Sequence, residues 1–185
     1  SKLERLLEEV EKLIRRNKRI VREILREVRE LIERNIRVSE EINRRNRRLI
    51  EEIRRLVEED KDKEKLRKKV EDLAEKVRES LERNEKHSRE VEERIKELIR
   101  RLREHSEDVR RRIREVLKEL AKTTDDERVK RILKEIERLV EESKRESERV
   151  LEEIKELVKD SKRRSKEVND HSKKLVDEVR EAVKK

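Results

Sequence analysis

The chain nearly repeats itself every eighteen residues, and this period constrains the fold more than any other feature. Three consecutive blocks, residues 3–20, 21–38 and 39–56, read LERLLEEVEKLIRRNKRI, VREILREVRELIERNIRV and SEEINRRNRRLIEEIRRL. Eighteen residues make about five turns of an α-helix, so an apolar stripe with this period stays on one side of a straight helix. A seven-residue repeat would instead require a left-handed supercoil, and an eleven-residue repeat a right-handed one. The sequence therefore predicts long, nearly untwisted helices.

The composition favours folded helices in spite of its high charge. Charged residues make up 59% of the chain and hydrophobic residues 30%, values that on their own would suggest disorder. The hydrophobic residues recur at helical spacing in every block, however, and this pattern is typical of amphipathic helices. The chain contains no Gly, Pro, Cys, Met, Trp, Tyr or Phe. The lack of cysteine excludes disulfides, thiol catalysis and cysteine-based zinc sites.

The hydropathy pattern also argues against a membrane protein. No apolar run approaches the roughly 18 residues of a membrane span, and the N-terminus lacks a signal peptide. We therefore expect a soluble protein that does not associate with membranes. We expect no natural cellular location, and a cytoplasmic one when the protein is expressed recombinantly.

The net charge of +9 raises the possibility of nucleic-acid binding, because basic proteins gain affinity by displacing phosphate counterions. The densest basic segments are residues 44–48, with four arginines, and residues 162–164, which could lie near them. However, 50 acidic residues are interleaved with 59 basic ones, and no aromatic side chain is available to stack on bases. The charges are better interpreted as solvated helix faces with ion pairs between residues three or four apart. We expect no specific nucleic-acid partner.

Two short breaks in the periodicity predict three helices, at about residues 1–59, 63–121 and 125–184. Asp60 or Asp62 can cap the second helix, and Thr124 has capping-box spacing to Glu127 in the third. Short connections between such long helices force neighbours to run antiparallel. Each apolar stripe covers an arc of about 120°, so three stripes can close around one axis. The predicted fold is an all-α, antiparallel up-down-up three-helix bundle, with residues 1–185 forming a single domain.

Polar residues interrupt the apolar stripes at positions that should face the core. If residues 60 and 63 meet at one end, polar residues of all three helices fall into three layers, each with one histidine. The first predicted layer contains Asn17, His105, Ser106, Ser143 and Ser147; the second contains Asn35, Ser39, Asn84, His87, Ser88, Ser161 and Ser165; the third contains Asn43, Asn46, Ser80, Asn169, His171 and Ser172. An unpaired buried polar group costs about 1–3 kcal/mol, so we interpret the layers as hydrogen-bond networks that penalise a wrong helix register.

A simpler interpretation of the same residues stays open. The serines could merely permit close approach of the helices, and the histidines could face solvent. The helical wheel gives this alternative some support, because it places His87, His105 and especially His171 at the edges of their stripes.

The arrangement of the histidines argues against catalysis or metal binding. Asn84, Leu102 and Val168 stand three residues before the three histidines, so the Glu-x-x-His of di-iron bundles is missing. The side chains of sequence neighbours such as His87 and Ser88 diverge on a helix and cannot form a nucleophile–base pair. We expect no catalytic, metal-binding or cofactor-binding residues and no cofactor.

These features together resemble computationally designed helical bundles with buried hydrogen-bond networks. The resemblance rests on the eighteen-residue repeats, the Asn, Ser and His layers, the missing Cys and aromatics, and the short Asp/Thr turns, and it covers the whole chain. Segments such as SKRESERVLEEIKELVKDSKRRSKEV are similar to helices of designed switch bundles, which however have more helices and Ala-rich faces. The resemblance implies a structural scaffold with no natural activity and no required partner.

Two alternative functions remain. One is a pH-responsive bundle, because each predicted layer contains a histidine. The other is a module that self-associates or binds a partner helix, for which Ile20 and Ile36 lie at opposite edges of the first helix's stripe.

Overall fold

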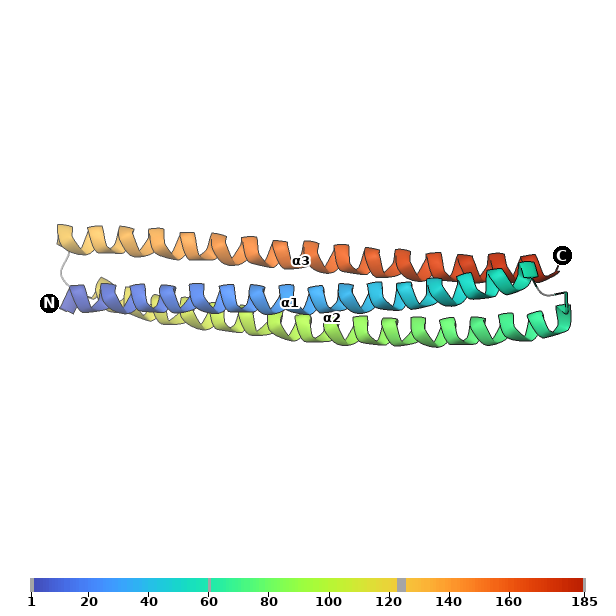
Figure 1. The fold of residues 1–185 in the computed structure, drawn as a ribbon. Coiled ribbons are helices and arrows are strands. Elements are labelled where there is room, and N and C mark those ends of the chain that lie inside the picture. Colours follow the sequence, from blue (N-terminus) through green and yellow to red (C-terminus); the bar gives the residue numbers. More distant parts are fainter. Residues whose placement is uncertain (1, 60, 123–125, 185) are drawn as a thin grey trace. The chain divides into compact units, whose positions relative to one another are not determined.

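Three long α-helices make up the fold in the computed structural model, which describes residues 2–59, 61–122 and 126–184 (Figure 1). They are α1 (Lys2–Glu59), α2 (Lys63–Ala121) and α3 (Glu127–Lys184), with 58, 59 and 58 residues. This confirms the predicted all-α fold of three long helices. The described residues contain no strand.

The helices run unbroken because nothing in their sequences interrupts them. Glycine and proline, the residues that most weaken a helix interior, do not occur in the chain. The start of α2 confirms one predicted cap: the backbone N–H of Lys65 donates to Asp62 Oδ1 at 3.4 Å. The other two predicted capping residues, Asp60 and Thr124, lie outside the described residues.

The contacts within the chain define two compact units, and each unit contains a segment of all three helices. Unit 1 comprises Ser1–Arg29 and Arg94–Glu156, and unit 2 comprises Glu30–Glu93 and Leu157–Lys185.

In unit 1, α1 runs antiparallel to α2 and parallel to α3. Asn17 contacts Ser106 of α2, and Glu27, farther along α1, contacts Arg94, which lies earlier in α2. The partners on α3 advance instead, from Ser143 beside Asn17 to Glu153 beside Arg29. The buried apolar core of unit 1 lies on the N-terminal side of Asn17 along α1. It contains Leu6, Val10, Leu13, Ile14, Val109, Ile113, Val116, Leu120 and Ile136.

Unit 2 repeats this arrangement of directions. Asn35 contacts Ser88 and Ser39 contacts Asn84, so a step of four residues forward on α1 matches four residues back on α2. On α3 the partners advance with α1, from Ser161 beside Asn35 to Glu178 beside Arg54. The buried apolar core of unit 2 contains Ile50, Leu66, Val70, Leu73, Ala74, Val77, Leu81, Val176, Val179 and Val183.

Burial follows the eighteen-residue period of the sequence. On α1, Ile14, Ile32 and Ile50 are all at most 5% exposed, and they stand one repeat apart. On α2 the same holds for Leu66, Asn84, Leu102 and Leu120, which include one polar residue. Along both helices the same side is therefore turned to the core over the repeats, and Asn84 occupies a position that is leucine in the repeats before and after it.

Candidate functional site

The buried polar residues of unit 1 form one small cluster between the three helices. The Asn17 side chain, 3% exposed, accepts a hydrogen bond from Ser106 Oγ at 3.3 Å and donates from Nδ2 to Ser143 Oγ at 3.0 Å. Ser147 is also buried, but the described residues include no hydrogen bond from it to this cluster. We call Asn17, Ser106 and Ser143 the unit 1 cluster. The adjacent cavity measures about 10 Å³, about the space of one water molecule.

Unit 2 holds a larger network, centred on Asn84 of α2, which is completely buried. Asn84 Oδ1 accepts from Ser39 Oγ at 2.9 Å, and its Nδ2 donates to Asn169 Oδ1 at 3.2 Å and to Ser165 Oγ at 3.4 Å. These bonds connect α2 to α1 and to α3.

A second asparagine, Asn35 of α1, completes this network. Asn35 Nδ2 donates to Ser161 Oγ at 3.2 Å, and Asn35 Oδ1 accepts from Ser88 Oγ at the same distance. Ser88 and Ser165 share a further bond of 3.4 Å, which joins the Asn35 and Asn84 parts. We call the connected set the unit 2 network; it contains Asn35, Ser39, Asn84, Ser88, Ser161, Ser165 and Asn169.

The unit 2 network differs from the predicted second layer in two respects: it includes Asn169, and it does not include His87. The sequence reasoning assigned Asn169 to the third layer, but its bond with Asn84 joins it to the second. What is left of the third layer is a separate contact between Ser80 Oγ and Asn46 Oδ1, at 3.0 Å. Ser80 also lies 2.9 Å from the Val77 carbonyl oxygen, so its single proton is shared between two acceptors. Ser172 is 1% exposed, and the described residues include no hydrogen bond from it to these groups.

Two asparagines of the third layer keep unpaired atoms. Asn46 is 2% exposed and its Nδ2 has no hydrogen-bond partner among the described residues. Asn43 is half-buried, and its buried Oδ1 likewise has none within the described part of the chain. The third layer is therefore the least satisfied of the three.

The histidines do not join the clusters. Among the described residues, no hydrogen bond links His87, His105 or His171 to the asparagines and serines. His87 and His105 are half-buried, each with a buried Nε2 that lacks a partner in the described structure. His171 is exposed, so the expectation of a buried histidine in the third layer is wrong. The helical wheel had already placed His171 nearest to solvent.

The surroundings of His105 shift the pKa of its imidazole. Burial removes water from the imidazole and lowers its pKa below the ordinary 6.5, and the positive charges of Arg16 and Arg112 lower it further, while Asp108 acts in the opposite direction. The neutral ring is therefore favoured in the folded state.

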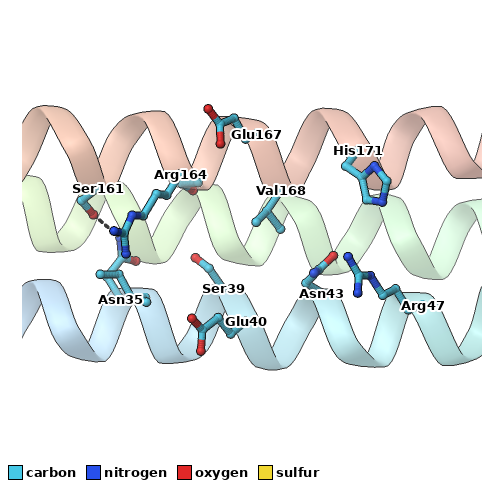
Figure 2. Close-up of a pocket in the computed structure, with 12 residues that line it drawn as sticks. Asn35, Ser39, Glu40, Asn43, Arg47, Ser161, Arg164, Glu167, Val168 and His171 are labelled. Atoms are coloured by element: carbon cyan, nitrogen blue, oxygen red, sulfur yellow. Dashed lines mark hydrogen bonds between the residues drawn. The ribbon is translucent and has the colours of Figure 1, made fainter.

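An open pocket of about 300 Å³ lies between α1 and α3 within unit 2 (Figure 2). Its walls combine the edge of the unit 2 network with charged and apolar side chains. It is lined by Asn35, Ile36, Ser39, Glu40, Asn43, Arg47, Ser161, Arg164, Ser165, Glu167, Val168 and His171. The two basic segments identified in the sequence thus each contribute an arginine, Arg47 and Arg164, to one pocket.

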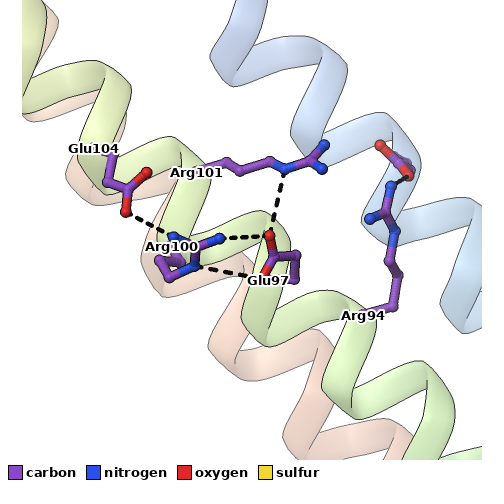
Figure 3. A network of polar contacts seen from close by, with 6 residues as sticks. Arg94, Glu97, Arg100, Arg101 and Glu104 are labelled. Atoms are coloured by element: carbon purple, nitrogen blue, oxygen red, sulfur yellow. Dashed lines mark hydrogen bonds and ion pairs between the residues drawn. The ribbon is translucent and has the colours of Figure 1, made fainter.

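Outside the clusters, the helix surfaces carry ordered ion pairs. Arg100 donates to Glu97 at 2.6 Å and to Glu104 at 2.8 Å, as Figure 3 shows on α2. The same acid–arginine–acid spacing recurs around Arg78, Arg138 and Arg163. In the example of Figure 3, the hydrogen bond from Arg100 holds the pKa of Glu97 below its usual value. These pairs support the sequence-based interpretation of the charges, and being exposed they are weakened by salt.

The described residues provide no group of three or more His, Asp or Glu side chains that could hold a metal ion. Within the described ranges, none of the helices is long and apolar enough to cross a membrane. The two predicted contact residues, Ile20 and Ile36, are both half-buried, and no large hydrophobic side chain of the described residues is exposed.

Comparison with known proteins gives one informative result. The chain is similar to a solved structure described as a computationally designed three helix bundle. The alignment covers 99% of this chain and 91% of that chain, with a TM-score of 0.61 and 21% sequence identity. This likeness shows that the chain has the fold of a three-helix bundle. No protein-family model and no curated protein sequence matches the chain.

Proposed function

We propose that this chain is a designed structural scaffold without catalytic activity, in which buried asparagine and serine side chains specify how the helices pair. The structural neighbour described as designed supports the proposal, as does the eighteen-residue repeat without any glycine, proline or aromatic residue. Natural chains rarely lack all of these residue types, since glycine and proline alone make up about 12% of ordinary proteins.

The observation that carries the proposal is the position of Asn84. From α2, this one side chain bonds Ser39 of α1 and both Ser165 and Asn169 of α3. Sliding one helix by a turn, about 5.4 Å, would break these bonds and leave buried polar atoms unpaired, at about 1–3 kcal/mol each. Purely apolar layers with a regular repeat would tolerate such a slip far better, because one aliphatic side chain can take the place of another.

The proposal is tested by replacing the polar side chains of the unit 2 network with apolar ones. In one variant, Asn35, Asn84 and Asn169 become leucine and Ser39, Ser88, Ser161 and Ser165 become alanine. Spin labels at the exposed positions Arg34 of α1 and Lys159 of α3 report the register of these helices. We expect one narrow distance distribution for the parent chain, and a broader or split distribution for the variant at unchanged helix content. Identical distributions in both proteins would refute a role in register.

We further propose that residues 1–185 fold as a single domain, although the contacts form two units. The proposal is supported by α1, which runs from unit 1 residues into unit 2 residues as one helix, Lys2–Glu59. Amide hydrogen exchange, measured separately for the two units, tests this proposal. We expect the amides of both cores to exchange with the same free energy of opening. Two separate values would contradict the single domain.

A pH response is the second candidate function, and His105 is the observation that favours it. Its imidazole is half-buried, its Nε2 has no partner in the described residues, and burial lowers its pKa. The exposure of His171 limits any such response to fewer sites than the sequence suggested.

A further inference from the structure

The eighteen-residue repeat allows the pocket of unit 2 to be compared with the equivalent surface of unit 1. In unit 1, Arg29 of α1 forms an ion pair with Glu153 of α3. One repeat later on each helix stand Arg47 and His171, and both line the pocket. The carboxylate that faces the arginine in unit 1 is thus replaced by an imidazole in unit 2.

The neighbouring pair changes in a similar way. In unit 1, Arg22 Nε lies 3.9 Å from Glu146 Oε1. One repeat later these positions hold Glu40 and Arg164, which both line the pocket, but the described residues include no ion pair between them.

Arg47 is left without a carboxylate partner among the described residues, at the edge of a pocket with space for a small molecule. In Figure 2 its side chain extends towards Asn43, and the His171 ring projects from α3 on the same side of the pocket. The side-chain amide of Asn43 also has an unpaired atom, Oδ1. Rotating this amide by half a revolution about its bond to Cβ would place the N–H donors of Nδ2 where Oδ1 now lies.

We propose that this pocket binds a small oxoanion, a phosphate or phosphate monoester, which takes the place that the Glu153 carboxylate has beside Arg29. The guanidinium of Arg47 provides two parallel N–H donors that match the geometry of phosphate oxygens. His171 and Asn43 supply further donors, and Ile36 and Val168 form an apolar wall for an organic substituent.

Two acidic residues also line the pocket, and their positions decide which end the anion occupies. Glu167 lies 3.8 Å from Arg163 Nη1, so its charge is partly compensated. Glu40 stands two helical turns from Arg47 on α1, a separation of about 10 Å along the axis. The anion is therefore expected at the end with Arg47 and His171, away from Glu40.

The experiment is a titration of the full-length protein with inorganic phosphate and, separately, with phenyl phosphate, followed by amide chemical shifts at constant ionic strength. Saturable shifts confined to residues 35–47 and 161–171 are expected, with phenyl phosphate binding more tightly through the apolar wall. Shifts that grow linearly without saturation, or that spread over all basic surfaces, would overturn the proposal.

Three single variants distinguish a built site from general attraction to a basic protein. Arg47→Gln should weaken binding about tenfold, as expected for the loss of a hydrogen bond to a charged group. His171→Glu should abolish binding, because it restores the carboxylate that pairs with the arginine in unit 1. Arg44→Gln removes the same charge from an exposed residue outside the pocket lining and should leave binding unchanged. If Arg44→Gln and Arg47→Gln weaken binding equally, or His171→Glu binds as the parent does, the site is refuted.

Discussion

Unit 1 and unit 2 are built from the same repeat and have apolar cores of the same kind, yet their polar residues are satisfied to different degrees. The unit 1 cluster is small and leaves a cavity of about 10 Å³. The unit 2 network is larger, borders a pocket of about 300 Å³, and is followed by the Asn43 and Asn46 side chains with unpaired amide atoms. The difference shows that buried polar residues added to an apolar repeat do not all find a partner, and each one that does not carries a cost in stability.

The first test of this comparison concerns the apolar cores, which should behave alike. Ile14 in unit 1 and Ile50 in unit 2 are 4% and 1% exposed and occupy equivalent positions of the repeat. Replacing either by alanine should lower the free energy of unfolding by about 2–5 kcal/mol, through lost burial and the cavity that remains. Denaturant unfolding measures both. A loss in unit 2 of less than half that in unit 1 would mean that its core is already loosely packed, and the two cores could no longer be treated as equivalent.

The second test separates the two polar clusters. Asn84→Ala leaves Ser39 without its acceptor and Asn169 without its donor, while Asn17→Ala removes the partner of Ser106 and Ser143. Each change should cost about 1–3 kcal/mol, with Asn84→Ala at the upper end because its site is completely buried.

Arg83→Ala, a substitution at the exposed residue before Asn84, is the matched control and should be close to neutral. Equal stability of the Asn84→Ala and Arg83→Ala variants in denaturant unfolding would show that the network bonds contribute nothing net.

The sequence predicted the fold and which polar residues lie level with one another, but not the pairing of individual atoms. The period of the stripe is enough to bring Asn35 level with Ser88 and Ser161, since helix geometry and short connections fix the register. The period could not show that Asn84 reaches Asn169 of the third layer in addition to Ser39 and Ser165 of its own layer, because this depends on rotamers.

The histidines were harder to place for a related reason. A residue at the edge of an apolar stripe can turn its side chain towards the core or towards water, and the wheel angle alone does not decide between them. His105 turns partly inward and His171 stays outside. The sequence placed the two basic segments near each other, but it did not predict the pocket, because the space between them depends on the packing of α1 against α3 within unit 2.

The third test exploits the unpaired atom of Asn43. Replacing Asn43 by leucine removes a buried acceptor without a partner and adds apolar surface, so unfolding should require up to about 1 kcal/mol more free energy. The same substitution at Asn17 in unit 1, Asn17→Leu, breaks two existing hydrogen bonds and should destabilise the protein. Changes of opposite sign in the free energy of unfolding for the two variants, measured by thermal or denaturant unfolding, would support the comparison. If Asn43→Leu destabilises as much as Asn17→Leu, the Asn43 carbonyl has a partner in solution, such as bound water.

The smallest expected effect is a dependence of stability on pH that arises at His105 in unit 1. Burial and the charges of Arg16 and Arg112 hold the pKa of His105 below its ordinary value of 6.5 in the folded state. The unfolded chain therefore binds a proton at a higher pH than the folded chain does. The contribution of neutral His105 is complete above pH 6.5 and is lost as the pH falls through 6.5 towards the lower folded-state pKa.

Replacing His105 by glutamine should accordingly reduce the loss of stability between pH 7.5 and 5, measured as the shift of the denaturant midpoint. His171→Gln is the matched control, because it also replaces one imidazole but at an exposed position. The carboxylates titrate in the same way in both variants, so their contribution cancels in the comparison. Parallel midpoints of the two variants over this range would mean that the burial of His105 does not contribute to the pH dependence of stability.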